Sequence, residues 1–131
     1  MSDKPWENEP DSLDWSHAGL RCAIRRGPLT GALNGYVAVP AGHPQDGQLP
    51  DDDSFGIHGG FTYSDGHLPG PERPSWDEGY WWIGFDCAHA GDLIPEIGPF
   101  FDEDVYRDIA YVREQAERLA SHLAAIAKAK A

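Results

Sequence analysis

The residues best suited to chemistry lie together in one short segment, Gly84-Phe85-Asp86-Cys87-Ala88-His89-Ala90-Gly91-Asp92. Two carboxylates, a thiol and an imidazole follow directly after the apolar run Tyr80–Phe85, which contains two tryptophans. Polar groups that follow a buried strand emerge at its end, where loops commonly build binding and catalytic sites. We therefore expect functional groups at this strand end.

Three kinds of chemistry fit this segment. Cys87 could act as a nucleophile, with His89 or His58 as the base and Asp86 as the orienting acid. A divalent metal could be held by His58, His89 and either Asp92 or Asp86, although the chain has no HExxH or CxxC motif. The same groups could instead hydrogen-bond a polar ligand while aromatic side chains stack on it. Cys87 also fits a small core residue, and Asp86 and Asp92 also fit turn caps.

Two further segments place a histidine beside glycine or proline. The segment Ile57-His58-Gly59-Gly60-Phe61-Thr62-Tyr63 has a glycine pair that lets the backbone approach a ligand or a neighbouring strand closely. In Gly42-His43-Pro44 an imidazole is held in a restricted loop. The first segment also fits a plain turn into a strand, and the second also fits a rigid loop with an exposed histidine. No GxGxxG, P-loop or GxSxG motif occurs, and we expect no cofactor.

Hydropathy period and turn residues predict the strands that carry these segments. Leu20–Ile24 and Gly35–Pro40 read as the two strands of a hairpin. Gly60–Tyr63 and Tyr80–Phe85 read as a third and a fourth strand. Trp81 and Trp82 then point to opposite faces of the sheet.

The C-terminal part of the chain predicts one long helix. Its apolar residues recur at spacings of three and four from Val105 to Ile126, and the acidic run 102–104 (Asp102, Glu103 and Asp104) offers N-cap candidates. The fold class is therefore α+β, a small antiparallel sheet of about four strands packed by this helix. Residues 1–14 are expected to be a flexible acidic tail, and residues 15–131 a single domain.

Charge and composition restrict the class of partner. The 131 residues carry a net charge of −12, and residues 40–104 alone carry −13, mostly in turn-rich stretches. Clustered Lys and Arg for a phosphate backbone are lacking, so we expect no nucleic-acid partner. There is no apolar run of about 18 residues for a membrane span and no hydrophobic leader at the N-terminus. Two widely spaced cysteines fit reduced thiols, and we expect a cytoplasmic protein.

Several of these motifs resemble a family of small proteins of tailed bacteriophages and prophages. The resemblance covers roughly residues 20–125 and is carried by Gly35–Pro40 with Gly42-His43-Pro44, by His58–Tyr63, and most specifically by Gly84–Asp92. No activity is established for that family. A phage origin implies an accessory protein that counters host defence by binding a defence protein, degrading a signal or sequestering a nucleotide signal.

The favoured interpretation is a counter-defence protein that binds and sequesters a polar small molecule, with a nucleotide immune signal as the leading candidate. Arg21, Arg25, Arg26 or Arg107 could meet phosphates. A Cys/His- or metal-dependent hydrolase and an acidic inhibitor of a host protein are the alternatives. We expect a homodimer, because one of the two strand tryptophans faces away from the helix. The residues predicted to contact the ligand are His43, His58, Tyr63, Trp82, Asp86, His89, Asp92 and Arg107.

Overall fold

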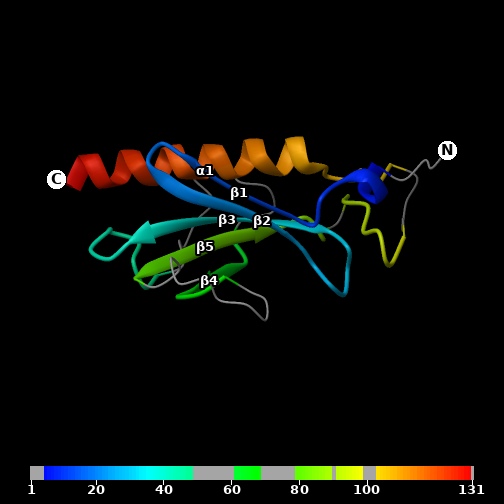
Figure 1. Ribbon diagram of the computed structural model, residues 1–131, viewed down its shortest axis with the longest axis horizontal. Coiled ribbons are helices and arrows are strands. Elements are labelled where there is room, and N and C mark those ends of the chain that lie inside the picture. The colour runs from blue at the N-terminus through cyan, green and yellow to red at the C-terminus, as the bar shows by residue number, and fades with distance from the viewer. Residues whose placement is uncertain (1–4, 49–60, 69–78, 90, 99–102, 131) are drawn as a thin grey trace.

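The architecture is an antiparallel sheet with one long helix lying along one face (Figure 1). The computed structural model describes residues 5–48, 61–68, 79–89, 91–98 and 103–130. Within these residues the sheet has five strands in the order β1-β2-β3-β5-β4. The elements are a 3-10 turn η1 (Pro5–Asn8), β1 (Ser12–His17), β2 (Leu20–Arg26), β3 (Leu33–Pro40), β4 (Tyr63–Asp65), β5 (Tyr80–Asp86) and α1 (Ile109–Lys130).

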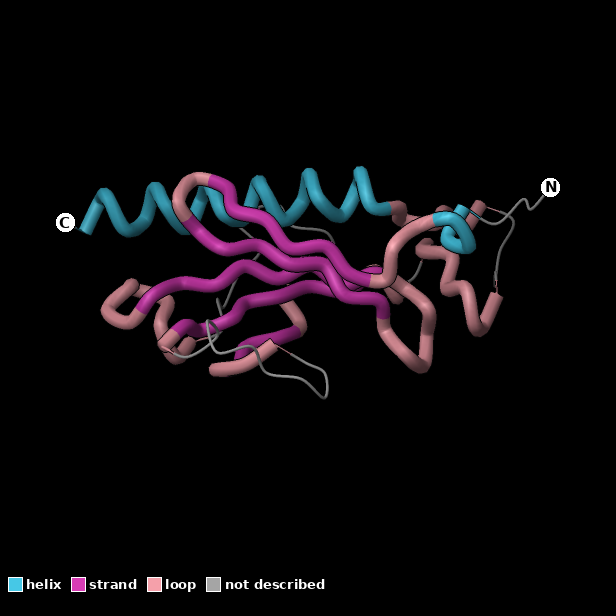
Figure 2. Tube along the Cα trace, in the orientation of Figure 1, coloured by secondary structure: helices cyan, strands magenta, loops and turns pink. Residues whose placement is uncertain are grey.

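The predicted α+β class and the long C-terminal helix are confirmed, and the helix covers one sheet face as expected (Figure 2). The strand count differs by one, because β1 pairs with β2 across its whole length. The predicted third strand is displaced, since β4 begins at Tyr63, where that strand was expected to end. No helix among the described residues is long and apolar enough to cross a membrane.

The β1–β2 hairpin closes through two residues in the left-handed region. His17 faces Leu20, and the loop residues Ala18 and Gly19 have φ values of 54° and 81°. A two-residue loop with positive φ at both positions matches the right-handed twist of the flanking strands. Among the described residues, Ala18 is the one residue other than glycine that has a positive φ. The sequence signal for this hairpin is weak, because Ala-Gly stands where Asn-Gly is usual.

The expected acidic tail is wrong for the described part of residues 1–14. Ser12–Asp14 belong to β1, and Glu9 is tied to the start of the helix. One Glu9 oxygen accepts the Ile109 amide at 2.8 Å, and the other accepts the Tyr106 hydroxyl. The Trp6 ring packs on Tyr106 with centroids 4.8 Å apart. The Glu9 carboxylate therefore accepts one of the amides that the helix start leaves unpaired.

The helix begins later than the predicted cap. Asp108 is the N-cap, and its carboxylate accepts the Tyr111 amide at 2.9 Å. Asp104 lies before the helix, in the stretch that leads to Val105, which pairs as an isolated bridge with Asp92. Asp102 lies outside the described residues. Val105 fits the three- and four-residue spacing of the apolar stripe, but it belongs to a bridge that precedes the helix. The apolar stripe therefore starts before the helix does.

The helix face of the sheet holds the main core. Side chains of β2, β3 and β5 bury against Val112, Ala116, Leu119 and Leu123 of α1. Both cysteines, Cys22 and Cys87, are free and buried in this core; their relative exposures are 1% and 2%. Burial of contiguous apolar surface of this kind supplies most of the stability of a small domain.

The central strands are joined by two glycine–aromatic pairs. Gly35 faces Phe85 and Tyr36 faces Gly84, so each ring lies over the glycine opposite, on opposite faces of the sheet. A Cβ atom on Gly84 would come within 2.5 Å of the Tyr36 ring. The glycines of the Gly-Tyr and Gly-Phe dipeptides therefore make room for the rings rather than for a turn.

Trp82 does not require a second subunit. It is fully buried in a small cluster with Tyr36 and Leu68 on the sheet face away from α1. Trp81 lies on the helix side, and its indole N–H donates to Ser64 Oγ at 2.7 Å. The exposed aromatic surface that favoured a homodimer is thus covered within one chain. The homodimer stays a prediction.

Candidate ligand-binding face and the 86–92 turn

The segment 86–92 folds back on itself as a compact turn after β5. The Asp86 carboxylate accepts the Ala88 amide at 3.0 Å, as expected for an aspartate that starts a turn. The Asp92 amide donates to the His89 carbonyl at 2.9 Å, and the Asp92 carboxylate accepts the His89 amide at 3.0 Å. Local hydrogen bonds therefore account for both carboxylates as turn-forming groups.

Asp92 also links this turn to the approach to α1. Its side chain is 1% exposed, and Oδ1 accepts a hydrogen bond from Arg107 Nε at 2.9 Å. The Arg107 guanidinium stacks over the Tyr111 ring at 4.8 Å from the centroid. A buried carboxylate needs such a partner to offset the loss of hydration. Asp92 and Arg107, which were expected to contact ligand, form a structural ion pair.

Asp86 and His89 form a more accessible pair. His89 Nδ1 lies 3.2 Å from Asp86 Oδ1, and both side chains are 32% exposed. A carboxylate beside one ring nitrogen can fix the orientation of an imidazole. These two predicted site residues are therefore brought together.

Cys87 is not placed as a nucleophile. Burial, followed by the negative charges of Asp92 and Asp86, raises the pKa of its thiol to about 12. The thiolate is the nucleophilic form of cysteine, so the thiol of Cys87 is almost entirely protonated and inert near neutral pH. Its position in the main core fits a packing role.

His43 lies far from this turn. Pro40 faces Tyr80 at one end of β3, whereas Asn34 faces Asp86 at the other, which separates the two ends by about 20 Å. The His43 ring is nearly buried, with Nε2 at 2.8 Å from the Leu123 carbonyl and Nδ1 accepting the Gln45 amide at 3.0 Å. His43 thus anchors its loop to α1 and does not share a site with His89. His58 lies outside the described residues.

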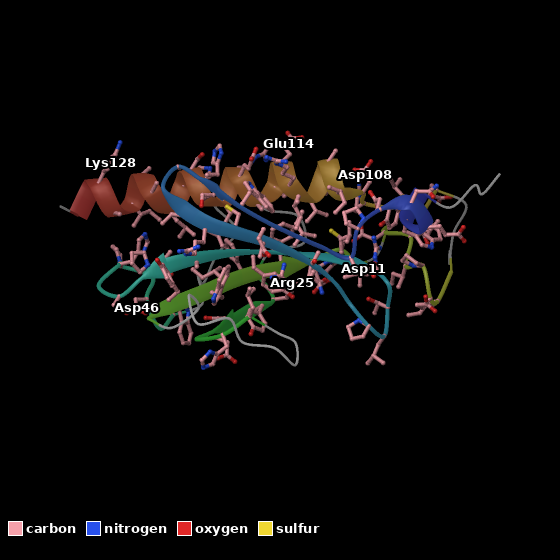
Figure 3. All side chains as sticks on the ribbon, viewed as in Figure 1. Asp11, Arg25, Asp46, Asp108, Glu114 and Lys128 are labelled. Carbon is pink, nitrogen blue, oxygen red and sulfur yellow. The ribbon has the colours of Figure 1, made fainter. Side chains whose placement is uncertain are left out.

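The sheet face away from α1 carries most of the polar strand residues. Strand alternation places Arg21, Ala23 and Arg25 of β2 on this face, and the register puts Arg25 beside Asn34 and Asn34 beside Asp86. Arg25 projects on the side opposite the helix (Figure 3) and pairs with Asp14 at 2.8 Å. A cross-strand row of polar groups therefore runs over three strands.

Aromatic rings occupy the neighbouring rows of this face. Tyr36 and Tyr63 meet edge to face with centroids 5.2 Å apart. Burial is the largest of the causes that raise the pKa of Tyr36 to about 12, so its hydroxyl stays protonated. The Arg21 guanidinium lies 5.4 Å from the centre of the half-buried Tyr80 ring. Of the predicted ligand contacts, Tyr63, Trp82 and Asp86 share this face, which we call the open face.

A hollow of about 210 Å³ lies over the β1–β2 hairpin. Ser16 and Arg21 face each other in the register, and both line it together with Asp14, Trp15 and Cys22. Its volume is below the roughly 300–1,000 Å³ of sites for drug-sized molecules. A space of this size suits one polar group of a ligand, and an arginine and a hydroxyl can donate hydrogen bonds to an anionic group.

Sequence reasoning named Arg21 and Arg25 as phosphate contacts but missed Asp14, Ser16 and Asn34. The signal was present in Ser12–His17, which alternates polar and apolar residues as a half-buried strand does. The expected boundary at residue 14 falls inside β1, so the strand that completes the hollow was not recognised.

A metal centre is not supported by the described part of the chain, where no group of three or more His, Cys, Asp or Glu side chains could hold an ion. His89 Nδ1 and Asp92 Oδ2 are 3.9 Å apart, and the third predicted ligand, His58, is not described.

Comparison of the chain with protein-family models, curated proteins and solved structures found no match. The open face and the 86–92 turn are therefore the features from which we infer function.

Proposed function

We propose that this protein binds a small anionic molecule with a planar part, such as a nucleotide, on the open face, and holds it without chemical change. The observation that carries the proposal is the hollow lined by Ser16 and Arg21, with Tyr80 beside the guanidinium. Arginine recognises phosphate through paired N–H donors, and an aromatic side chain contributes about 1–3 kcal/mol per stacked base.

Two features support binding over catalysis. The thiol of Cys87 is buried and has a raised pKa, which opposes thiolate chemistry. Asp92 and Arg107 are engaged with each other, so neither is positioned for a reacting group. The sequestration of an immune signal and the phage counter-defence role stay predictions from the sequence resemblance.

The test is recovery of a bound ligand. The full chain is purified without chelator from a host infected with the phage or expressing the gene, and native mass spectrometry measures any added mass. One ligand per chain, released intact by denaturation, supports the proposal. A chain without added mass that also binds no member of a panel of nucleoside mono-, di- and triphosphates and cyclic nucleotides contradicts it.

One observation favours a second candidate, a hydrolase that uses His89 as general base. His89 Nδ1 lies 3.2 Å from Asp86 Oδ1, and the side chain is partly exposed at a strand end, an arrangement that a general base can use. Turnover of a member of the same panel by the wild type, lost in His89→Ala and kept in Cys87→Ala, would support this candidate. Intact ligand after prolonged incubation excludes it.

A further inference from the structure

One end of the molecule exposes apolar side chains that the core does not use. The exposed large apolar side chains of the described residues are Leu29, Ile97 and Val105, with 86%, 55% and 49% of their surface accessible. Scattered exposed apolar residues are ordinary, but several gathered at one end are typical of an interaction surface.

Backbone contacts hold the three segments that carry these residues together. The Glu96 amide donates to the Thr30 carbonyl at 2.9 Å, which joins the 93–98 loop to the turn between β2 and β3. The Leu93 amide donates to the Val105 carbonyl at 2.8 Å. The turn, the loop and the start of α1 lie at the same end of the molecule (Figure 1). We call this surface, defined by Leu29, Ile97 and Val105, the apolar end.

The segments of the apolar end carry exposed acidic side chains. The nearby basic side chains are already paired: Arg26 is 13% exposed and bonds to Asp11 at 2.7 Å, and Arg107 bonds to Asp92. Arg26 also donates to the Gly31 carbonyl and to the Tyr106 hydroxyl, which places Asp11 beside the same turn. The exposed acids on or beside these segments are Asp11, Glu96, Glu103 and Asp108.

We propose that the apolar end is a docking surface for a protein segment that is basic and carries apolar side chains at its centre. Charge complementarity identifies this partner, because the exposed rim is acidic while apolar residues supply the contact area. A second copy docked symmetrically on the same end would set acid against acid. Nucleic acids and anionic lipids are repelled by the same rim.

This inference is independent of the proposed ligand site, which lies on the open face, and its test uses a different probe. A fluorescein-labelled 16-residue amphipathic peptide of Leu and Lys is titrated into the full chain at low salt, with binding followed by anisotropy and amide chemical shifts. Binding with shifts confined to residues 27–32, 93–98 and 103–108 is the expected result. The Leu29→Ser/Ile97→Ser variant should weaken binding at least tenfold, and Glu96→Lys should weaken it about fivefold.

The matched control is Glu114→Lys, which reverses an exposed acid on the solvent side of α1 and should change binding less than twofold. An equal loss in Glu114→Lys and Glu96→Lys would show general charge attraction and overturn the proposal. Chemical-shift changes on the open face would also overturn the proposal. A dimer in sedimentation that dissociates in the Leu29→Ser/Ile97→Ser variant would overturn it as well. The Leu29→Ser/Ile97→Ser variant should still bind nucleotide. A failure of the docking proposal can therefore be told apart from a failure of the proposed function.

Discussion

Asp92 shows how a residue that looks functional in the sequence can be required by the fold. Its carboxylate is almost completely buried, so it depends on Arg107 and on the His89 amide to replace lost hydration. The pair joins the end of β5 to the segment that leads into α1. The polar richness of residues 86–92 therefore reflects mainly the hydrogen bonds of a buried turn, with Asp86 and His89 left partly exposed.

Replacing Arg107 tests this structural role. Arg107→Ala leaves the Asp92 charge buried without its ionic partner, and it should lower the free energy of unfolding by about 3 kcal/mol. Asp92→Asn/Arg107→Ala removes the charge as well and should recover part of this loss. Urea unfolding measures both variants. If Arg107→Ala were as stable as wild type but lost ligand, the pair would belong to the binding site instead.

The two cysteines make stability fall at alkaline pH. Burial raises the pKa of both Cys22 and Cys87 from 9.0 to about 12. The folded chain thus keeps protons that the unfolded chain releases, so the thiol contribution is complete below pH 9 and declines as pH rises toward 12. Each thiol adds a slope approaching about 1.4 kcal/mol per pH unit.

Urea unfolding at pH 8.0, 9.0 and 9.8, below the main titration of tyrosine, measures this slope. Cys22→Ala/Cys87→Ala should be less stable at pH 8 because of the lost packing, but its stability should depend less on pH. Equal pH dependence in the variant and the wild type would mean that the thiols do not carry the effect.

The elements show which parts of the fold a single sequence can predict. The hairpin strands Leu20–Ile24 and Gly35–Pro40, the strand Tyr80–Phe85 and the long helix were predictable. Alternation marks the first, β-branched and aromatic residues the second, a continuous apolar run the third, and a spacing of three and four the helix. The sheet edge was not. β1 is short, lies in an acidic stretch, and turns through Ala18-Gly19, which lacks the usual asparagine.

The candidate site was less predictable than the fold, since it depends on register. The sequence placed histidines and aspartates in one pocket, but pairing of β3 with β5 sends His43 and Asp86 to opposite ends. Strand pairing likewise brings Arg21 opposite Ser16. Which residues of separate strands lie together depends on which strands pair and in which register. The spacing of residues along the chain does not reveal this.

The turn at Ala18 offers a stabilising substitution. An L-residue with a Cβ atom is strained at positive φ, whereas asparagine tolerates this region and is favoured at the first position of such hairpins. Ala18→Asn should raise the free energy of unfolding by about 0.5–1 kcal/mol. Thermal unfolding checks it, with exposed Ala110→Asn on α1 as the control, which should be neutral or destabilising.

The open face and the apolar end are two different surfaces on different parts of the molecule. Helix α1 covers one side of the sheet, the open face carries arginines and tyrosines on the other side, and the apolar end lies where β2 turns into β3. Although the overall charge is −12, Arg21 and Arg25 of β2 lie on the open face, where Arg25 is paired with Asp14 and Arg21 lies beside Tyr80. Local basic groups in an acidic molecule favour a small anion over an extended polyanion.

The most direct measurement of the central claim is calorimetric titration of a nucleotide panel into the wild type, Arg21→Ala and Arg118→Ala. Arg118 is an exposed arginine of α1 and matches the change in charge. We expect at least one nucleotide to bind with a stoichiometry of one, Arg21→Ala to weaken its binding at least tenfold, and Arg118→Ala to change it less than twofold. Equal affinity in wild type and Arg21→Ala would contradict binding on the open face.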